Sequence, residues 1–154
     1  MEDRMKGTGP AHEGDRLIAA DATPWLPMNA STRFRLLRCS RETGQTTLML
    51  KIAAGTRAPA HTHFGASEYL VLSGTMELDG GELAGGVTAR AGDYGYEATG
   101  AVHGETFFPE ETVLYFTRYG PSATIGENQQ ILSVLDWKRL SELQAEGLAQ
   151  LGGT

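Results

Sequence analysis

The sequence is poor in cysteine, since Cys39 is the only one among its 154 residues. A single cysteine excludes an internal disulfide and any metal site built from several thiolates. The sequence also lacks a run of about 18 apolar residues, the length of a membrane-spanning helix. Residues 1–15 are polar and of mixed charge, without the apolar stretch of a secretory signal peptide. We therefore expect a soluble, cytoplasmic protein with no membrane partner.

Basic residues are fewer than acidic residues in this chain. Thirteen lysines and arginines face nineteen aspartates and glutamates, which gives a formal net charge of −6. Such a surface repels the phosphates of nucleic acids, so we expect no nucleic-acid partner. A chain of 154 residues with a hydrophobic share of 40% suffices to build the core of one globular domain.

Glycine, in contrast, is abundant, with 20 residues that mark many turns. Between the turns lie short stretches in which apolar and polar residues alternate, and this period of two is typical of strands with one buried face. The expected strands lie at 32–36, 48–52, 68–72, 75–78, 87–89, 94–97, 102–107, 112–119 and 131–135. Their spacing favours an all-β sandwich or barrel over βαβ units.

The two ends of the chain break this pattern. Residues 1–16 combine glycine, proline and charged side chains, which predicts a flexible N-terminal tail before a single domain at 17–154. Near the C-terminus, apolar residues recur at helical spacing from Trp137 onward. Asp136 is placed to cap the start of this helix and Gly152 to end it.

Two histidines in one short segment are the first candidates for chemistry. His61 and His63 are two residues apart, so on a strand they point to the same face at a separation of about 6–7 Å. Two imidazoles so placed can bind one metal ion. Glu68 lies at an odd spacing from His63, but a turn at 65–67 could return it to the histidines as a further ligand. Taken alone, such a pair also fits two ordinary strand histidines.

A third histidine strengthens the metal hypothesis. His103 follows Gly100 and an expected tight turn, and three of the four histidines of the chain thus fall in two glycine-bounded segments. Three neutral imidazoles bind Fe(II), Zn(II), Ni(II) or Cu(II) far better than Mg²⁺ or Ca²⁺, which prefer oxygen ligands. We therefore expect His61, His63 and His103 to hold one divalent metal ion.

These segments resemble the two motifs of the cupin superfamily, Gly-x5-His-x-His-x3,4-Glu-x6-Gly and Gly-x5-Pro-x-Gly-x2-His. The matching residues of the first motif are Gly55, His61, His63, Glu68 and, one residue early, Gly74. Those of the second are Gly92, Gly100 and His103, with Ala98 in place of the proline. The resemblance implies a single-domain cupin jelly-roll β-barrel, here with a C-terminal helix.

A closer resemblance, from about residue 32 to 140, is to the acetylacetone-cleaving (β-diketone) dioxygenases. It rests on Gly-Ala-Ser-Glu-Tyr at 65–69, Gly-Gly-Glu-Leu-Ala-Gly-Gly at 80–86, the segment 94–109 and Tyr-Gly-Pro at 119–121. It implies Fe(II) on three histidines, with Tyr69, Glu97 and Thr106 supporting the site and Glu68 not a ligand. Among these we expect Glu97 to orient a metal-bound imidazole by accepting its other N–H.

The sequence departs from this family in its expected substrate pocket. Asp79 stands where the family has an arginine, and Ala58, Leu114 and Arg118 stand where it has apolar aromatic side chains. Leu114 and Arg118 share one face of an expected strand. Arg118 then has three possible roles: a pair with Asp79, an ordinary surface position, or selection of a substrate that carries a carboxylate.

The resemblance implies an Fe(II)-dependent dioxygenase that uses O₂ to cleave a C–C bond of a β-dicarbonyl substrate, within a homo-oligomer of two or four chains. Two other classes fit the same residues. One is a non-catalytic metal-binding cupin that senses or binds a ligand through Zn(II) or Ni(II), and the other is a metal-dependent isomerase or hydrolase, because the fold alone does not determine function.

Overall fold

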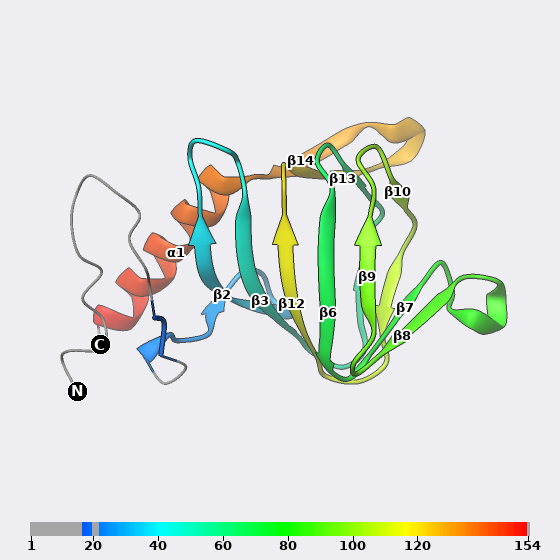
Figure 1. Ribbon diagram of the computed structural model, residues 1–154, viewed down its shortest axis with the longest axis horizontal. Coiled ribbons are helices and arrows are strands. Elements are labelled where there is room, and N and C mark those ends of the chain that lie inside the picture. The colour runs from blue at the N-terminus through cyan, green and yellow to red at the C-terminus, as the bar shows by residue number, and fades with distance from the viewer. Residues whose placement is uncertain (1–16, 20–21, 154) are drawn as a thin grey trace.

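The computed structural model describes residues 17–19 and 22–153. Within this part of the chain, strands form three antiparallel sheets, and a single α-helix follows them (Figure 1). The expected tail at 1–16, which includes His12, lies outside the described residues. The all-β class with a C-terminal helix is confirmed.

The largest sheet has six strands in the order β1-β2-β3-β12-β6-β9. Their bounds are β1 Leu26–Pro27, β2 Thr32–Cys39, β3 Thr46–Ile52, β12 Thr112–Arg118, β6 Ser67–Ser73 and β9 Tyr94–Glu97. Alternation along these strands sends every second side chain inward, as in β3, where Leu48, Leu50 and Ile52 are buried. Burying one such side chain stabilises the fold by about 1.5–3 kcal/mol.

Two four-stranded sheets complete the fold. One has the order β10 Val102–His103, β5 His61–His63, β13 Ser122–Ile125 and β14 Ile131–Leu135, and the other β4 Thr56–Ala58, β11 Thr106–Phe108, β7 Thr75–Leu78 and β8 Val87–Arg90. Short 3-10 turns at Glu82–Ala84 (η3) and Glu127–Gln129 (η4) connect neighbouring strands. Within the described residues the three sheets do not hydrogen-bond into one closed cylinder.

The strand expected at 102–107 is divided in the structure into β10 and β11. The break falls at Gly104, whose backbone N–H donates a hydrogen bond to Asp79 Oδ1 at 3.0 Å instead of to a neighbouring strand. β1, β4 and β13 were not among the expected strands. They span two to four residues, which is too short for a period of two to be recognised.

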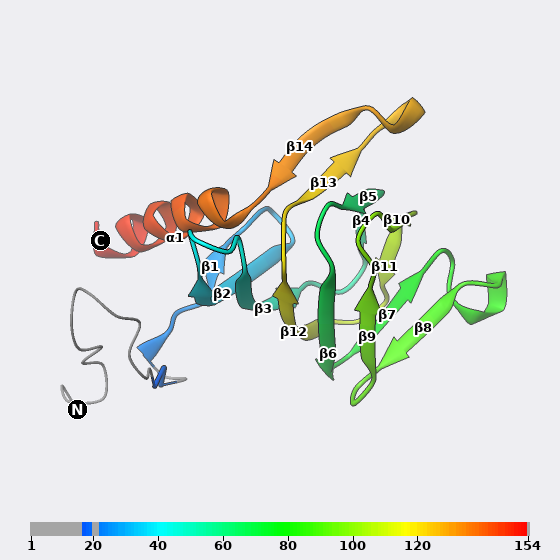
Figure 2. The ribbon, with the colours of Figure 1, turned by 45° about the horizontal axis from the view of Figure 1, so that its top comes forward.

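The C-terminal helix α1 (Trp137–Gly152) begins as expected. The Asp136 side chain accepts a hydrogen bond from the Arg139 backbone N–H at 2.8 Å, which satisfies one of the free amides of the first turn. The helix ends at Gly152, the glycine expected to end it. α1 lies beside β1 and β2 (Figure 2), with Leu140 fully buried against the core. No helix in the described part of the chain is long and apolar enough to cross a membrane.

A close approach of two loops holds the start of β6 in place. A Cβ added at Gly65 would lie 2.5 Å from Cα and N of Gly120, so only glycine fits there. The loop between β5 and β6 therefore rests directly on the loop between β12 and β13. β6 begins two residues after this contact, at Ser67.

Candidate metal centre

Strand pairing brings the three histidines together. In the ladder between β10 and β5, His103 is directly opposite His61, and opposite residues of an antiparallel pair point to the same face. His63 shares this face because it is two residues beyond His61. The ring centroids of His61, His63 and His103 are 5.0–5.2 Å apart. His61 and His63 of β5 and His103 of β10 thus meet on one face, as expected from the sequence.

The fourth member of the cluster is Glu97, at the end of β9. One ligand atom from each of His61, His63, His103 and Glu97 lies within 4.8 Å of the others. Glu97 Oε2 is 3.3 Å from His63 Nε2, and Glu97 Oε1 is 3.5 Å from His103 Nε2. Glu97 and His63 are buried, and His61 and His103 are half-buried.

The donor atoms of this cluster fit a divalent metal ion. His63 Nε2, His103 Nε2 and Glu97 Oε2 are buried and have no hydrogen-bond partner among the described residues. Leaving buried polar atoms unpaired is costly, so their convergence indicates a ligand between them. Two ligands at about 2.1 Å from one ion lie about 3.0–3.4 Å apart at ordinary coordination angles. The observed separations of 3.3 and 3.5 Å are close to this range.

Hydrogen bonds at the other ring nitrogens orient two of the imidazoles. His61 Nδ1 lies 3.3 Å from the Pro59 carbonyl oxygen, to which it donates, and His63 Nδ1 lies 3.1 Å from Ser67 Oγ. With Nδ1 occupied, Nε2 is left for the ion, which is the arrangement that metal-binding histidines usually show. Ser67 is fully buried at the first position of β6.

Burial keeps the imidazoles neutral. It lowers the pKa of His63 to about 3, with smaller contributions from His61, His103 and Arg118, and it also lowers the pKa of His61 and of His103. Neutral imidazole is the form that binds metal. Burial raises the pKa of Glu97 to about 7, against the charge of Arg118. Because the imidazoles are neutral, the contacts between Glu97 and the histidines are not ion pairs.

The surroundings of Glu97 differ from those expected. Glu97 was expected to accept the N–H that a metal-bound imidazole leaves free, yet its oxygens face the Nε2 atoms that point to the cluster. Ser67 and Pro59 occupy the place that was assigned to Glu97. No local pattern in the sequence points to Ser67, because its position depends on the turn at residues 64–66.

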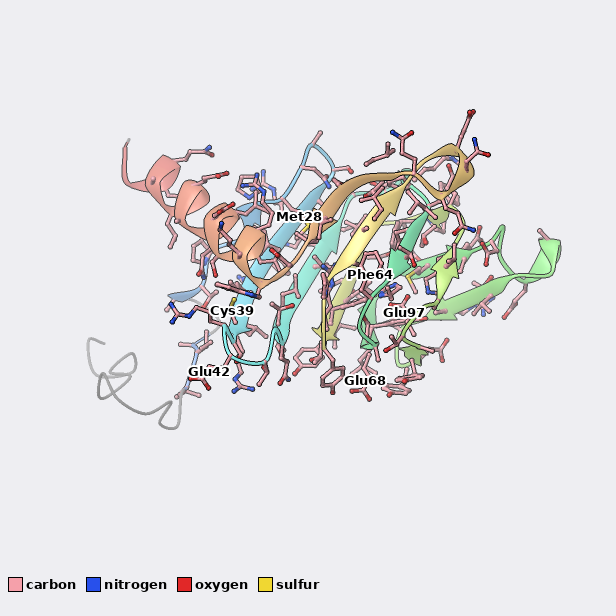
Figure 3. All side chains as sticks on the ribbon, turned by 90° about the horizontal axis from the view of Figure 1, so that it is seen from above. Met28, Cys39, Glu42, Phe64, Glu68 and Glu97 are labelled. Atoms are coloured by element: carbon pink, nitrogen blue, oxygen red, sulfur yellow. The ribbon has the colours of Figure 1, made fainter. Side chains whose placement is uncertain are left out.

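Glu68, the fourth candidate ligand from the sequence, does not lie with the histidines. Its carboxylate is on the outer face of β6, where the hydroxyls of Tyr94 and Tyr119 both donate to it (Figure 3). These two hydrogen bonds lower its pKa. The reason is parity: Ser67 and Tyr69 turn inward on β6, so the residue between them turns outward.

We expect Glu68→Gln to bind as much metal as the natural protein, because the side chain is on the other face of the sheet. The measurement is metal content per chain after loading and gel filtration, with His103→Gln as the variant that should lose metal. A Glu68→Gln protein as poor in metal as His103→Gln would show that Glu68 does reach the ion.

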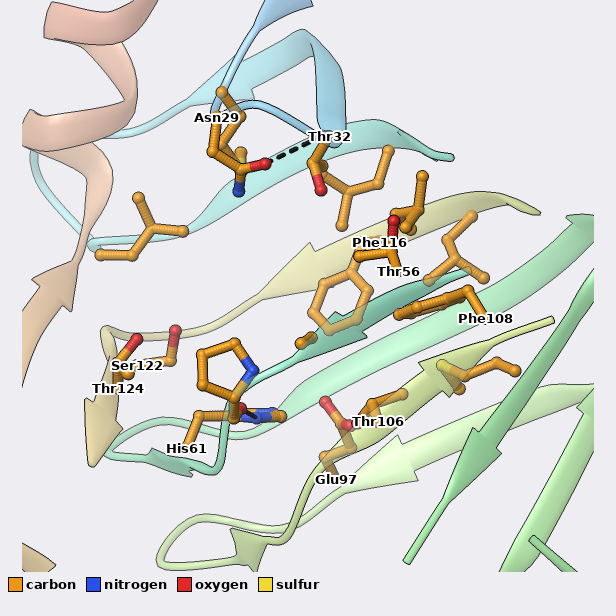
Figure 4. Close-up of a pocket in the computed structure, with 18 of the residues that line it drawn as sticks. Asn29, Thr32, Thr56, His61, Glu97, Thr106, Phe108, Phe116, Ser122 and Thr124 are labelled. Atoms are coloured by element: carbon orange, nitrogen blue, oxygen red, sulfur yellow. Dashed lines mark hydrogen bonds between the residues drawn. The ribbon is translucent and has the colours of Figure 1, made fainter. Parts of the chain in front are cut away.

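A cavity of about 210 Å³ opens next to the cluster (Figure 4). Its wall is mainly apolar, and His61, His63, Glu97 and Thr106 contribute polar groups. The other lining residues are Met28, Asn29, Thr32, Leu50, Ile52, Thr56, Ala58, Pro59, Met76, Leu78, Phe108, Leu114, Phe116, Arg118, Ser122, Ala123, Thr124 and Leu135. A largely apolar cavity with a few polar groups is typical of a site for a small molecule.

The remaining candidate residues lie in or near this cavity. Ala58 and Thr106 are paired across β4 and β11, and both line it, as does Leu114 on β12. Tyr69 is buried beside it, stacked on Phe116 with ring centroids 5.9 Å apart. The structure thus brings together every pocket residue expected from the sequence.

Arg118 also lines the cavity, on the same face of β12 as Leu114 and Phe116, as expected. It does not pair with Asp79: among the described residues, Asp79 instead accepts the hydrogen bond from the Gly104 backbone. The pairing alternative is therefore wrong. Within the described part of the chain, Arg118 Nε and Nη1 are buried without a hydrogen-bond partner, so the plain surface position does not hold either.

Comparison with known proteins gives consistent matches. Residues 13–123 match the model of the ChrR cupin-like domain family. The chain is 40% identical over 116 residues to an acetylacetone-cleaving enzyme of Acinetobacter johnsonii, which covers 75% of this chain and 74% of that protein.

Solved structures agree with these matches. An acetylacetone dioxygenase from Acinetobacter johnsonii superposes with a TM-score of 0.77 at 32% identity, covering 93% of this chain and 99% of its own. A candidate acetylacetone dioxygenase from Methylibium petroleiphilum gives 0.80 at 31% identity, over 88% and 97%. An RmlC-like cupin from Ralstonia eutropha, at 19% identity and a TM-score of 0.78, shows the fold alone.

Proposed function

The chain belongs to the ChrR cupin-like family, and we propose that it is a metal-dependent dioxygenase that cleaves a C–C bond of a β-dicarbonyl compound with O₂. The observation that carries this proposal is the cluster of His61, His63, His103 and Glu97 at the wall of a small apolar cavity. The 40% identity of the chain to an acetylacetone-cleaving enzyme supports the reaction class.

We propose Fe(II) as the ion, held by His61, His63 and His103 through Nε2. The chemistry that Fe(II) supplies in such sites is an open position for O₂ and substrate and a positive charge that favours an enolate. Zn(II) and Ni(II) fit the same donors, so the donor set alone does not choose among these ions.

The reaction balances without any further reactant. One molecule of O₂ adds both of its oxygen atoms to the dicarbonyl, and one C–C bond breaks. The products are a carboxylic acid and a 1,2-dicarbonyl compound. The single proton lost when the substrate becomes an enolate returns to the products, so no external reductant is consumed.

The residues of the chain bind and enclose the substrate. Glu97 Oε2 is buried, has no hydrogen-bond partner in residues 17–19 and 22–153, and lies 3.3 Å from His63 Nε2, so it is placed to accept the proton that leaves the substrate. Phe108, Leu114 and Phe116 exclude water, and this strengthens electrostatic interactions inside the cavity. Thr106 lines the cavity together with Glu97, and Tyr69 stacks on the lining residue Phe116.

One experiment separates the three classes of function. Protein purified without O₂ is loaded with Fe(II) or Zn(II), and O₂ consumption is measured with a panel of β-dicarbonyls. We expect the Fe(II) form alone to consume one O₂ per dicarbonyl. Substrate loss without O₂ consumption would instead indicate an isomerase or hydrolase, and bound metal without any turnover a sensor or binding module.

We also propose a homo-oligomer, as the family resemblance implies. Apolar and aromatic side chains gather on the outer face of the six-stranded sheet: Leu70, Leu72, Tyr94, Tyr96 and Tyr115. In the ladder Leu70 stands between Tyr115 and Tyr94, which makes the patch continuous. Light scattering is expected to give a mass of two or four chains, and Leu70→Glu is expected to lower it. A natural protein with the mass of one chain would contradict this.

The cytoplasmic location stays a prediction.

A further inference from the structure

Three strands of the six-stranded sheet place two charged side chains on either side of Ser67. In the ladders, Arg118 of β12 is opposite Ser67 of β6, and Ser67 is opposite Glu97 of β9. Residues opposite one another point to the same face, so all three turn toward the cavity. Adjacent strands are about 4.8 Å apart, which puts the backbones of Arg118 and Glu97 about 10 Å apart.

Arg118 is a cation whose partner is missing from the described protein. Its Nε and Nη1 atoms are buried and make no hydrogen bond, and no ion pair within the described residues includes it. Its guanidinium lies 5.3 Å from the Phe116 ring centroid, which offers only a weak contact. Burial lowers its pKa to about 10, so it remains charged at neutral pH.

Glu97 does not fill this role. Its charge raises the pKa of Arg118, but it forms no ion pair with Arg118 among the described residues, and its two oxygens lie 3.3 Å from His63 Nε2 and 3.5 Å from His103 Nε2. Arg118 is close enough for its charge to lower the pKa of His61, His63 and Glu97, which places it near the metal cluster without a direct bond to it. A buried guanidinium without a hydrogen-bonded anion costs several kcal/mol, and this cost indicates an anion supplied from the cavity.

We propose that Arg118 binds a carboxylate of the substrate, so that the substrate is a β-dicarbonyl acid with its dicarbonyl end at the histidine cluster. The planar guanidinium matches a carboxylate through two parallel hydrogen bonds, a geometry that lysine cannot offer. Ala58, which also lines the cavity, leaves room beside it, since its side chain is a single methyl. The dicarbonyl part of this inference rests on the proposed function, whereas the binding of a carboxylate at Arg118 does not.

The test is binding without turnover. Zn(II)-loaded protein is titrated by calorimetry under argon with 2,4-dioxopentanoate and with its methyl ester, which has the same dicarbonyl but no charge. We expect the acid to bind about 10–100-fold more tightly than the ester, the range for hydrogen bonds to charged groups. The preference for the acid should be absent in Arg118→Met, and Arg118→Lys should keep part of it.

The outcomes discriminate among the alternatives. An acid-to-ester preference that is equal in the natural protein and Arg118→Met overturns the inference. The inference is also overturned if Arg118→Met loses binding of the acid, the ester and Zn(II) to the same extent. That result would show that Arg118 only balances the charge of Glu97. If Arg118→Met does not fold, Arg118→Gln replaces it. A clear preference for the acid in a protein whose Fe(II) form never consumes O₂ would contradict the proposed function and leave this inference standing.

Discussion

Replacing His63 by alanine is expected to lower the affinity for Fe(II) or Zn(II) by more than about 100-fold, the upper end of what loss of an outer hydrogen-bond partner causes. The variant removes one of three imidazoles and frees Ser67 Oγ from its contact with Nδ1. The protein should stay folded, because the hydrophobic core contains none of the histidines. The unpaired Ser67 hydroxyl costs about 1–3 kcal/mol, less than the stability of a typical domain.

Affinity is measured by competition with a chelator of known strength, and folding by circular dichroism. His63→Gln, which keeps more of the buried volume, separates the loss of a ligand from the effect of a void. His12→Ala, which changes the remaining histidine of the sequence, is the matched control and should bind metal normally. A His63→Ala protein that binds metal as tightly as the natural one would rule out His63 as a ligand.

Replacing Glu97 by glutamine is expected to have the second largest effect. The three imidazoles remain, so the variant should still fill with iron at saturating Fe(II). The amide removes the buried carboxylate that faces His63 and His103, and it puts an N–H₂ donor in place of one oxygen. We expect turnover to fall by about 10–100-fold.

The measurement is the rate of O₂ consumption per bound iron, with bound iron determined separately. Glu105→Gln is the control, because Glu105 is an exposed carboxylate that pairs with Arg57 and is not a member of the cluster. An unchanged rate and affinity would show that Glu97 takes no part in the site. Iron loss as severe as in His63→Ala would instead make Glu97 a ligand equal to the histidines.

Local patterns in the sequence determined much of this protein. The spacing of His61 and His63 fixes a common face, because side chains on a strand alternate whatever the rest of the fold does. Asp136 and the apolar residues after Trp137 define the helix for a similar reason, since capping involves only neighbouring residues. The two glycine-bounded histidine motifs were specific enough to indicate the family, which the comparisons confirm.

The family resemblance pointed to Glu97 over Glu68, but only the tertiary structure shows why Glu97 is the carboxylate that meets the histidines. Glu68 and Glu97 are both strand residues near a histidine motif, and their spacing from the histidines does not separate them. The turn at residues 64–66, pressed against Gly120, sets the phase of β6 so that Ser67 points inward and Glu68 outward. A shift of one residue in that turn would exchange them, because side chains alternate with period two.

The sequence alone likewise did not show whether Arg118 has a charged partner. Its face on β12 follows from alternation, but its lack of a partner depends on where Asp79 and Glu97 are placed by other strands. Asp79 is held by the Gly104 backbone, and Glu97 faces the histidines. Sequence order determines parity within a strand, whereas the pairing of charges across a cavity depends on turns and strand registers that only the folded chain fixes.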